Sequence, residues 1–367
     1  MSRPAPISWL LRHPVANAES RESAALLVGA AVFVVAAIPA AIIFWGHDVP
    51  ISGPGSVGQF VALVSAGAAI LVFIATRLVS HASRAEGTLL DPGPAGRGEL
   101  LRWYDIGAIA LAHGVIALLV WLAVAGLLSR SFVGAVVFPV PATLLAAVAI
   151  AVTAYSVFLS AVGLTPILMS VVLAVFVVAG TFASMLSAGD PLWWQKNLST
   201  LGISDDLSAF AFNLTVLIAG VIVTTLAHYA TAAIPVITPD ESRGRALIRG
   251  ALVLLGVLLA CVGLFPLDQN MTAHNVSATG MLVVFVTVVI GLRWWIPAIP
   301  RVFLLLGYVY LGIIALLAVW FVTGYYTLTA VELVAFLLIF SWLIVFLRQT
   351  GAMSPAETGI RADGSLG

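Results

Sequence analysis

The stretch from 141 to 187 reads PATLLAAVAIAVTAYSVFLSAVGLTPILMSVVLAVFVVAGTFASMLS and contains no charged side chain. It holds two apolar runs, 141–163 and 165–187, and each reaches the roughly 20 residues that a helix needs to cross a bilayer. Only a short turn around Gly163 and Pro166 separates them. Proline is favoured at the first position of a helix, where its missing N–H costs nothing. The stretch therefore predicts two membrane-spanning helices joined by a tight turn.

Runs of the same kind occur along most of the chain. Of its 367 residues, 62% are hydrophobic and 9% are charged, whereas a soluble domain has about 25% charged residues. So few charges cannot cover a water-exposed surface, which excludes a soluble globular protein. We predict an all-α fold, a polytopic integral membrane bundle of about 10 transmembrane helices. The expected spans are 24–45, 57–79, 106–128, 141–163, 165–187, 207–230, 247–266, 277–296, 302–323 and 328–347.

The basic residues indicate how the bundle is oriented. With ten spans, 14 of the 16 Lys and Arg residues fall on one side, and only Arg130 and Lys196 fall on the other. Because cytoplasmic loops carry the excess of Lys and Arg, both termini are expected in the cytoplasm. The chain is rich in Ala, Val and Gly, and 15 of its 16 basic residues are arginine, with Lys196 as the one lysine. This usage suggests a GC-rich bacterial source, so we expect a multi-pass protein of the bacterial plasma membrane.

Four parts are expected along the chain. Residues 1–22 form a cytoplasmic tail, 23–163 a module of four membrane helices, 164–348 a six-helix membrane domain, and 349–367 a disordered cytoplasmic tail. Loop lengths and residue patterns do not match between the two halves, which argues against the inverted repeat of many transporters. Glycines inside the spans predict close helix packing at Gly29, Gly67, Gly114, Gly220 and Gly256.

Several kinds of site are disfavoured. The net charge is zero, so the chain offers no basic footprint for nucleic acid. The single cysteine, Cys261, lies in an apolar run and is interpreted as a core residue. No His-x-x-x-His or Glu-x-x-His spacing and no phosphate-binding loop is present. We therefore expect no metal, no cofactor and no catalytic residue, although an enzyme is not excluded.

The loops expected outside hold the aromatic and acidic residues of the candidate site. Trp193 and Trp194 lie in the segment PLWWQKN, 191–197, which is predicted to lie at headgroup level, where Trp is enriched. Asp205 and Asp206 directly precede the sixth span. Carboxylates there stabilise the positive end of a helix dipole, which explains both residues without a ligand.

Four further residues, Asn213, Asp268, His274 and Glu332, complete the candidate ligand site near this side. Asp268 and His274 share one expected loop, so the carboxylate could orient the imidazole as a general base or ligand. The alternative is that His274 only caps a helix or bonds its own loop. Asn213 lies nearly two turns inside the sixth span, where it either bonds a neighbouring helix or contacts a headgroup.

Two ionisable residues lie inside spans and define a possible proton path. Glu332 is about one turn inside the tenth span, and His113 lies within the third. Ionisable groups in a membrane are candidates for function, because their charged forms are costly there. The alternatives are that Glu332 reaches the interface and that His113 is a neutral, hydrogen-bonded residue.

Two segments on the expected outer side are more distinctive than the rest. They are NLSTLGISDDLSAFAFNL, 197–214, and GLFPLDQNMTAHNVSA, 263–278. This pairing resembles the bacterial domain of unknown function family 998 and the related eukaryotic six-span proteins of the DRAM and FGF-receptor-activating type. The resemblance covers about 160–347. It implies a six-span domain. The bacterial family has no settled biochemical activity, and its eukaryotic relatives are linked loosely to lipid handling and membrane trafficking. The resemblance carries over Ser199, Gly202, Phe212, Asn213, Gly263, Pro266 and His274, whose roles in the family are undefined.

These observations support three hypotheses about function. The first is non-catalytic binding or organisation of membrane lipids, or assembly with a membrane-protein partner, at the outer leaflet. The second is a proton-coupled secondary transporter that uses Glu332 and His113. The third is an envelope enzyme on a lipid-linked substrate, with His274 beside Asp268 or Asp205.

Overall fold

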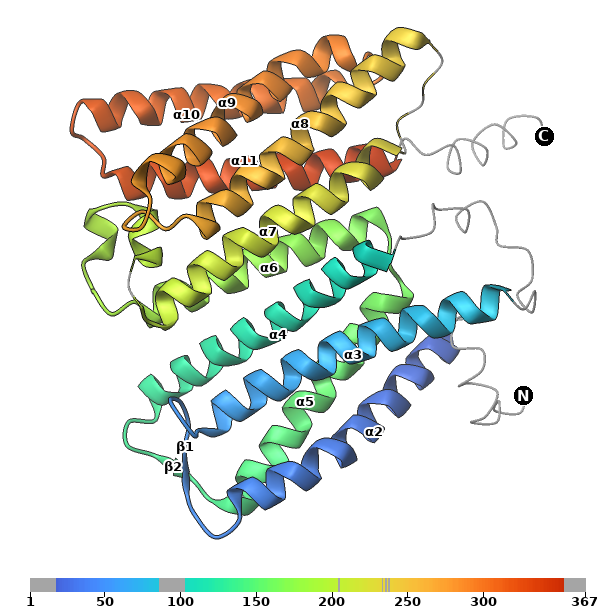
Figure 1. Ribbon diagram of the computed structural model, residues 1–367, viewed down its shortest axis with the longest axis vertical. Coiled ribbons are helices and arrows are strands. Elements are labelled where there is room, and N and C mark those ends of the chain that lie inside the picture. Colours follow the sequence, from blue (N-terminus) through green and yellow to red (C-terminus); the bar gives the residue numbers. More distant parts are fainter. Residues whose placement is uncertain are drawn as a thin grey trace. The chain divides into compact units, whose positions relative to one another are not determined.

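The computed structural model describes residues 18–85, 103–203, 205–232 and 238–352, together with Ile234 and Val236. Within these residues, ten helices are long and apolar enough to cross a membrane, and the only strands are two of two residues each. The predicted all-α polytopic membrane bundle is thus confirmed (Figure 1). Most of residues 1–22 and 349–367, predicted as tails, lie outside the described part of the chain.

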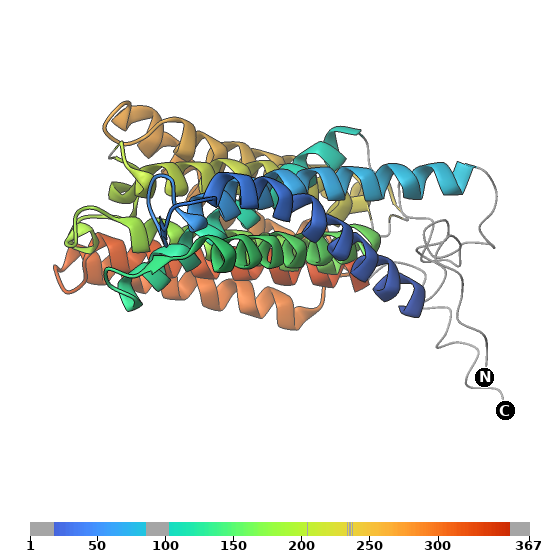
Figure 2. The same cartoon turned by 90° about the horizontal axis from the view of Figure 1, so that it is seen from below.

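The chain divides into two compact units, Met1–Leu164 and Thr165–Gly367, which we call unit 1 and unit 2. Unit 1 contains α2 (Ala18–Phe44), α3 (Val57–Ala85), α4 (Trp103–Ser131) and α5 (Pro139–Val162). Helix α5 packs against α2 and α3, and α3 also packs against α4. Figure 2 shows the same helices after a turn of 90° about the horizontal axis.

The core of unit 1 owes its close packing to small residues. Ala40 of α2 and Ala142, Ala146 and Ala149 of α5 are buried in one cluster with Phe44. Because the side chain of alanine is a single methyl group, these alanines let helix backbones approach closely, as in many helix pairs within membranes. The connections α2–α3 and α4–α5 contribute β1 (Val49–Pro50) and β2 (Val136–Val137), which pair antiparallel.

Unit 2 contains six long helices and two 3-10 turns. They are α6 (Pro166–Ser187), η2 (Trp193–Gln195), η3 (Leu198–Gly202), α7 (Leu207–Ala232), α8 (Pro239–Leu264), α9 (Met271–Trp295), α10 (Arg301–Val322) and α11 (Leu328–Ala352). Successive helices pack in order, and α11 packs back on α6 and α7, so the six helices close on themselves. Trp342 of α11 is 2% exposed and contacts the rings of Phe285, Phe303 and Phe346.

Two helices of unit 2 begin earlier than predicted. Helix α8 begins at Pro239 and not at 247, because Thr238 and Glu241 form a reciprocal capping box. Helix α9 begins at Met271 and not at 277, because the side chain of Asn270 accepts a hydrogen bond from the backbone N of Ala273. His274 therefore lies in the first turn of a helix and not in the loop that holds Asp268.

The glycine prediction is confirmed at three of five positions. A Cβ atom at Gly220 would lie 2.4 Å from the carbonyl oxygen of Gly256, and one at Gly256 would lie 2.6 Å from that of Gly220. At Gly114 a Cβ would lie 2.7 Å from the Ile70 side chain. A Cβ atom at Gly29 would make only ordinary van der Waals contacts. The prediction is wrong for Gly67, where an added Cβ would meet no other atom within 4 Å.

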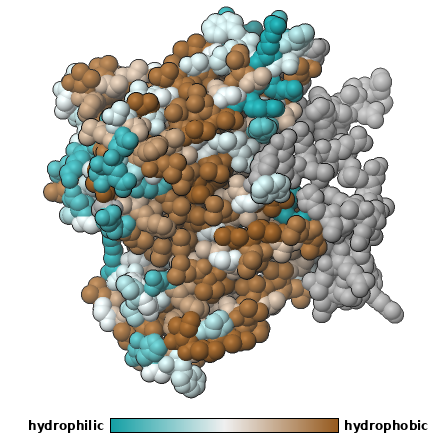
Figure 3. Space-filling model, in the orientation of Figure 1, coloured by the Kyte–Doolittle hydropathy of each residue, from teal (hydrophilic) through white to brown (hydrophobic). Residues whose placement is uncertain are grey.

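Each unit has one end that is poor in arginine. We use the name arginine-poor end for the β1–β2 end of unit 1, which has Arg130, and for the η2–η3 end of unit 2, which has Lys196. On the face shown in Figure 3, apolar side chains cover the middle of the helices and polar ones gather toward the ends. Side chains such as Val35 and Ile42 are more than two-thirds exposed, as expected of surfaces that face lipid.

Candidate functional site

The arginine-poor end of unit 2 is built around the segment between α6 and α7. Asp190 accepts hydrogen bonds from the backbone N of Leu192 at 2.8 Å and from Lys196 Nζ at 3.0 Å. The first of these, and then the second, lower the pKa of the Asp190 carboxyl, because both favour its charged form. Asn197 caps η3, since its Oδ1 accepts from the backbone N of Thr200 at 2.9 Å. These local bonds fix the course of the chain over the end of the helices.

Side chains from three membrane helices hold η3 in place. The Oε2 of Glu332 on α11 accepts from the backbone N of Leu198 at 2.5 Å, and the Nδ2 of Asn213 on α7 donates to the carbonyl O of Gly202 at 3.0 Å. The Nε2 of His274 on α9 lies 2.9 Å from Ser199 Oγ. We call Asn213, His274 and Glu332 the η3 tethers. The structure thus brings three predicted site residues together, on one short segment.

His274 has partners other than the predicted Asp268. Its Nδ1 lies 2.9 Å from the carbonyl O of Phe265, and its Nε2 faces the Ser199 hydroxyl. A carbonyl can only accept, so Nδ1 donates to it, and Nε2 lies within hydrogen-bonding distance of the hydroxyl. The ring is 4% exposed, and Asp268 is exposed in the α8–α9 loop. This arrangement matches the alternative in which His274 is a structural residue.

His113 in unit 1 has the same pattern of partners. Its Nδ1 lies 2.8 Å from the carbonyl O of Ile109, and its Nε2 lies 2.9 Å from Ser160 Oγ. Both histidines therefore link a helix to a serine that is far away in sequence. In unit 1 the link joins α4 and α5 inside the membrane-spanning part of the bundle. A proton path through His113 would have to break one of these bonds.

Asp205 and Asp206 lie at the start of α7. Asp206 caps this helix, since its Oδ1 accepts from the backbone N of Ala209 at 3.0 Å. This bond confirms that Asp206 stabilises the helix N-terminus. Both carboxylates also line a cavity of about 450 Å³ between α7 and the α8–α9 connection. Asp206 further lines a neighbouring cavity of about 300 Å³ beside η2 and η3.

The larger cavity, which we call the polar cavity, has both polar and apolar lining residues. The polar ones are Asp205, Asp206, Asn213 and Gln269, beside Gly202 and Gly263. The apolar ones are Ile203, Ala209, Phe210, Leu214, Leu217 and Pro266. Trp193 lines the smaller cavity, and Trp194 is half exposed nearby in η2. Glu332, His274 and Asp268 line neither cavity.

In the described residues, no three His, Cys, Asp or Glu side chains come together as a group that could hold a metal ion. Glu332 and Asn213 instead bond the backbone of η3, and Asp206 bonds the backbone of α7. Sequence reasoning did not foresee that Glu332 binds a main-chain N–H. The resemblance did single out Ser199 and Gly202, the η3 residues that His274 and Asn213 contact.

No family model matches this chain, and no curated protein and no solved structure is significantly similar to it.

Proposed function

We propose that this membrane protein is non-catalytic and binds a phospholipid headgroup in the polar cavity of unit 2. The observation that carries the proposal is the mixed lining of this cavity. Carboxylates and amides line the space together with the apolar side chains of Phe210, Leu214 and Leu217. A lipid presents polar and apolar groups together where its headgroup meets its acyl chains.

The charges of the cavity favour a headgroup with an amine. Asp205 and Asp206 contribute two carboxylates to the lining, which includes no Lys or Arg. A primary ammonium group can donate to both carboxylates, as a lysine does. The amides of Asn213 and Gln269 offer N–H donors toward a phosphate. Phosphatidylethanolamine meets these conditions, whereas an anionic lipid would face the two carboxylates with its own charge.

The roles of the tethers support binding over catalysis. Asn213, His274 and Glu332 each use a hydrogen-bonding group to hold η3, which borders the polar cavity at Gly202. Trp194 is suited to headgroup level. By the positive-inside rule, the arginine-poor ends face the outside and both termini face the cytoplasm of a bacterium. A likeness to family 998 is part of this proposal, and it agrees with lipid binding through the loose link of the eukaryotic relatives to lipid handling.

The test is native mass spectrometry of the protein in nanodiscs of equal parts phosphatidylethanolamine and phosphatidylglycerol. We expect one phosphatidylethanolamine to stay bound preferentially. Asp205→Asn should weaken this retention about two- to fivefold, the effect of losing one exposed ion pair. Asp268→Asn is the matched control, since it removes a carboxylate at the same end but outside the cavity.

Three outcomes would overturn the proposal. Equal retention of both lipids would mean that the cavity does not select a headgroup. An equal effect of Asp205→Asn and Asp268→Asn would mean that only the overall charge of this end matters. A co-extracted membrane protein that displaces the lipid would indicate an assembly role instead.

A further inference from the structure

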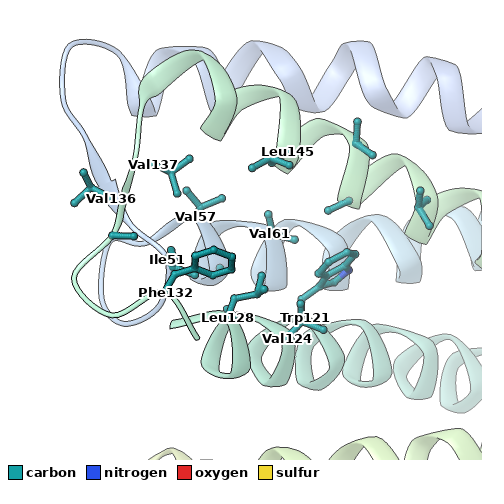
Figure 4. Close-up of a pocket in the computed structure, with 16 residues that line it drawn as sticks. Ile51, Val57, Val61, Trp121, Val124, Leu128, Phe132, Val136, Val137 and Leu145 are labelled. Carbon is teal, nitrogen blue, oxygen red and sulfur yellow. The ribbon is translucent and has the colours of Figure 1, made fainter. Parts of the chain in front are cut away.

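Unit 1 contains a cavity of about 520 Å³. Unlike the polar cavity, it has no charged and no amide side chain in its lining. It lies between α3, α4 and α5, beside the paired strands β1 and β2 (Figure 4). Its lining consists of Val, Leu, Ile, Ala and Phe side chains, one glycine and one tryptophan. The tryptophan is Trp121, whose indole N–H already donates to Thr153 Oγ1 at 2.9 Å. We call this space the apolar cavity.

The chemistry of the lining excludes water and headgroups as occupants. An apolar cavity of this kind stays dry, because water finds no hydrogen-bonding partner in it. A charged or zwitterionic group would lose its hydration without compensation. The occupant must therefore be hydrocarbon.

The size of the space selects among hydrocarbon occupants. An apolar cavity of about 150 Å³ holds one benzene ring, so by this scale the apolar cavity holds roughly twenty carbon atoms. That is the size of one lipid chain. It is too small for a protein helix, which is about 10–12 Å wide with its side chains.

The depth of the space agrees with a chain from a single leaflet. Trp121 at its deep end and Ser131 at the end of α4 are ten residues apart, which is about 15 Å along a helix axis. This is half of the roughly 30 Å hydrocarbon core of a bilayer. Phe132 and Val136 line the shallow end, next to the strands.

The cavity is also accessible from the side and firmly built. Leu128, Leu145, Val148 and Val152 line it and are 42 to 58% exposed, so a chain can enter laterally. Helices α3 and α4 are in close contact at two lining residues, Gly58 and Ala125. A Cβ added at Gly58 would lie 2.2 Å from the Cβ of Ala125. The backbone N of Gly58 also donates to the carbonyl O of Ile51 at 3.1 Å.

We propose that the apolar cavity of unit 1 is a binding site for one acyl chain of a membrane lipid in the leaflet at the arginine-poor end. The site is separate from the polar cavity of unit 2 and does not depend on the headgroup proposal. It would hold its lipid by the chain and not by the headgroup.

The probe is a phosphatidylethanolamine with a photoactivatable diazirine at the end of one acyl chain, reconstituted with the full-length protein. After illumination, we expect saturable labelling of Trp121 and the residues around Val152. Leu128→Trp should fill the cavity and lower this labelling about tenfold. Leu127→Trp is the matched control, because Leu127 is the adjacent leucine, is 55% exposed and does not line the cavity.

A second pair of variants repeats the comparison on α5. Val148→Phe should lower the labelling and Leu144→Phe should not, since only Val148 lines the cavity. Circular dichroism and gel filtration verify that each variant folds. Labelling spread evenly over all exposed apolar helices, without saturation, would overturn the proposal. Equal labelling of Leu128→Trp and Leu127→Trp, or crosslinks to another protein at Trp121, would also overturn it.

Discussion

In unit 1 the connections at the arginine-poor end pair with each other through backbone atoms, as Val49 opposes Val137 and Pro50 opposes Val136. In unit 2 the corresponding segment, η3, is held by the side chains of Asn213, His274 and Glu332. Buried main-chain groups need partners in either case. Strand pairing supplies these partners without polar side chains, so the adjoining cavity of unit 1 can be fully apolar. A 3-10 turn leaves main-chain groups that membrane helices must satisfy with polar side chains.

This comparison explains why Asn213 and Glu332 lie inside spans of unit 2. An intramembrane acid such as Glu332 is ordinarily suspected of transport or catalysis. Here its carboxylate accepts from a main-chain N–H, which gives it a structural task.

The largest effect is expected where α3 meets α4 in unit 1. Gly58→Ala should lower the free energy of unfolding by about 3 kcal/mol, because the new Cβ would collide with the Cβ of Ala125 and with the carbonyl O of Ile51. Gly67→Ala on the same helix has open space and should be neutral or stabilise by up to about 1 kcal/mol. Unfolding in mixed detergent micelles measures both. Similar losses for the two variants would show that α3 tolerates no added side chain anywhere.

The second prediction concerns the tether from α11 in unit 2. Glu332→Ala should destabilise the protein by about 2 kcal/mol, because it leaves the buried N–H of Leu198 without an acceptor. Glu332→Gln keeps an acceptor oxygen and should cost less than about 1 kcal/mol. The same unfolding assay applies. If Gln is as damaging as Ala, the charge itself is required. Proton flux in liposomes that Glu332→Gln abolishes would then favour the transporter hypothesis.

The third prediction compares the two histidine–serine pairs. Double-mutant cycles with His274→Ala and Ser199→Ala, and with His113→Ala and Ser160→Ala, should each give a coupling of about 0.5–1 kcal/mol. Both pairs join distant segments through one histidine–serine hydrogen bond, so their couplings should be alike. A coupling near zero for one pair would mean that its bond is replaced by water or lipid when broken.

The spans were predictable from sequence because each one is a continuous apolar run. The early starts of α8 and α9 were missed because Arg243, Arg245 and His274 interrupt the apolar runs. The capping groups Thr238, Glu241 and Asn270 decide where the helices begin. The caps are visible in the sequence, since Thr238 and Glu241 have the spacing of a capping box.

The candidate site was predictable only in part. Polarity in an apolar background singled out Asn213, His274 and Glu332, and these do converge. Their common partner was not predictable, because two of the three contacts reach main-chain atoms of η3, which every residue has. The apolar cavity of unit 1 gave no signal at all, since its lining residues look like any other membrane-facing residues. Such a space depends on how helices pack and not on residue type.

The smallest effect is expected at Asp190, an exposed residue between α6 and η2. The carboxyl should titrate below its ordinary pKa, first because the backbone N of Leu192 donates to it and then because Lys196 does. A folded-state pKa below the unfolded value stabilises the fold above about pH 4, and this contribution is lost as the pH falls through the folded value. NMR titration of the carboxyl carbon measures it. Lys196→Met should move the pKa only part of the way back, since the Leu192 bond remains. A full return would mean that the ion pair, and not the main chain, holds this segment, so that the end of unit 2 would depend on side chains even at its surface.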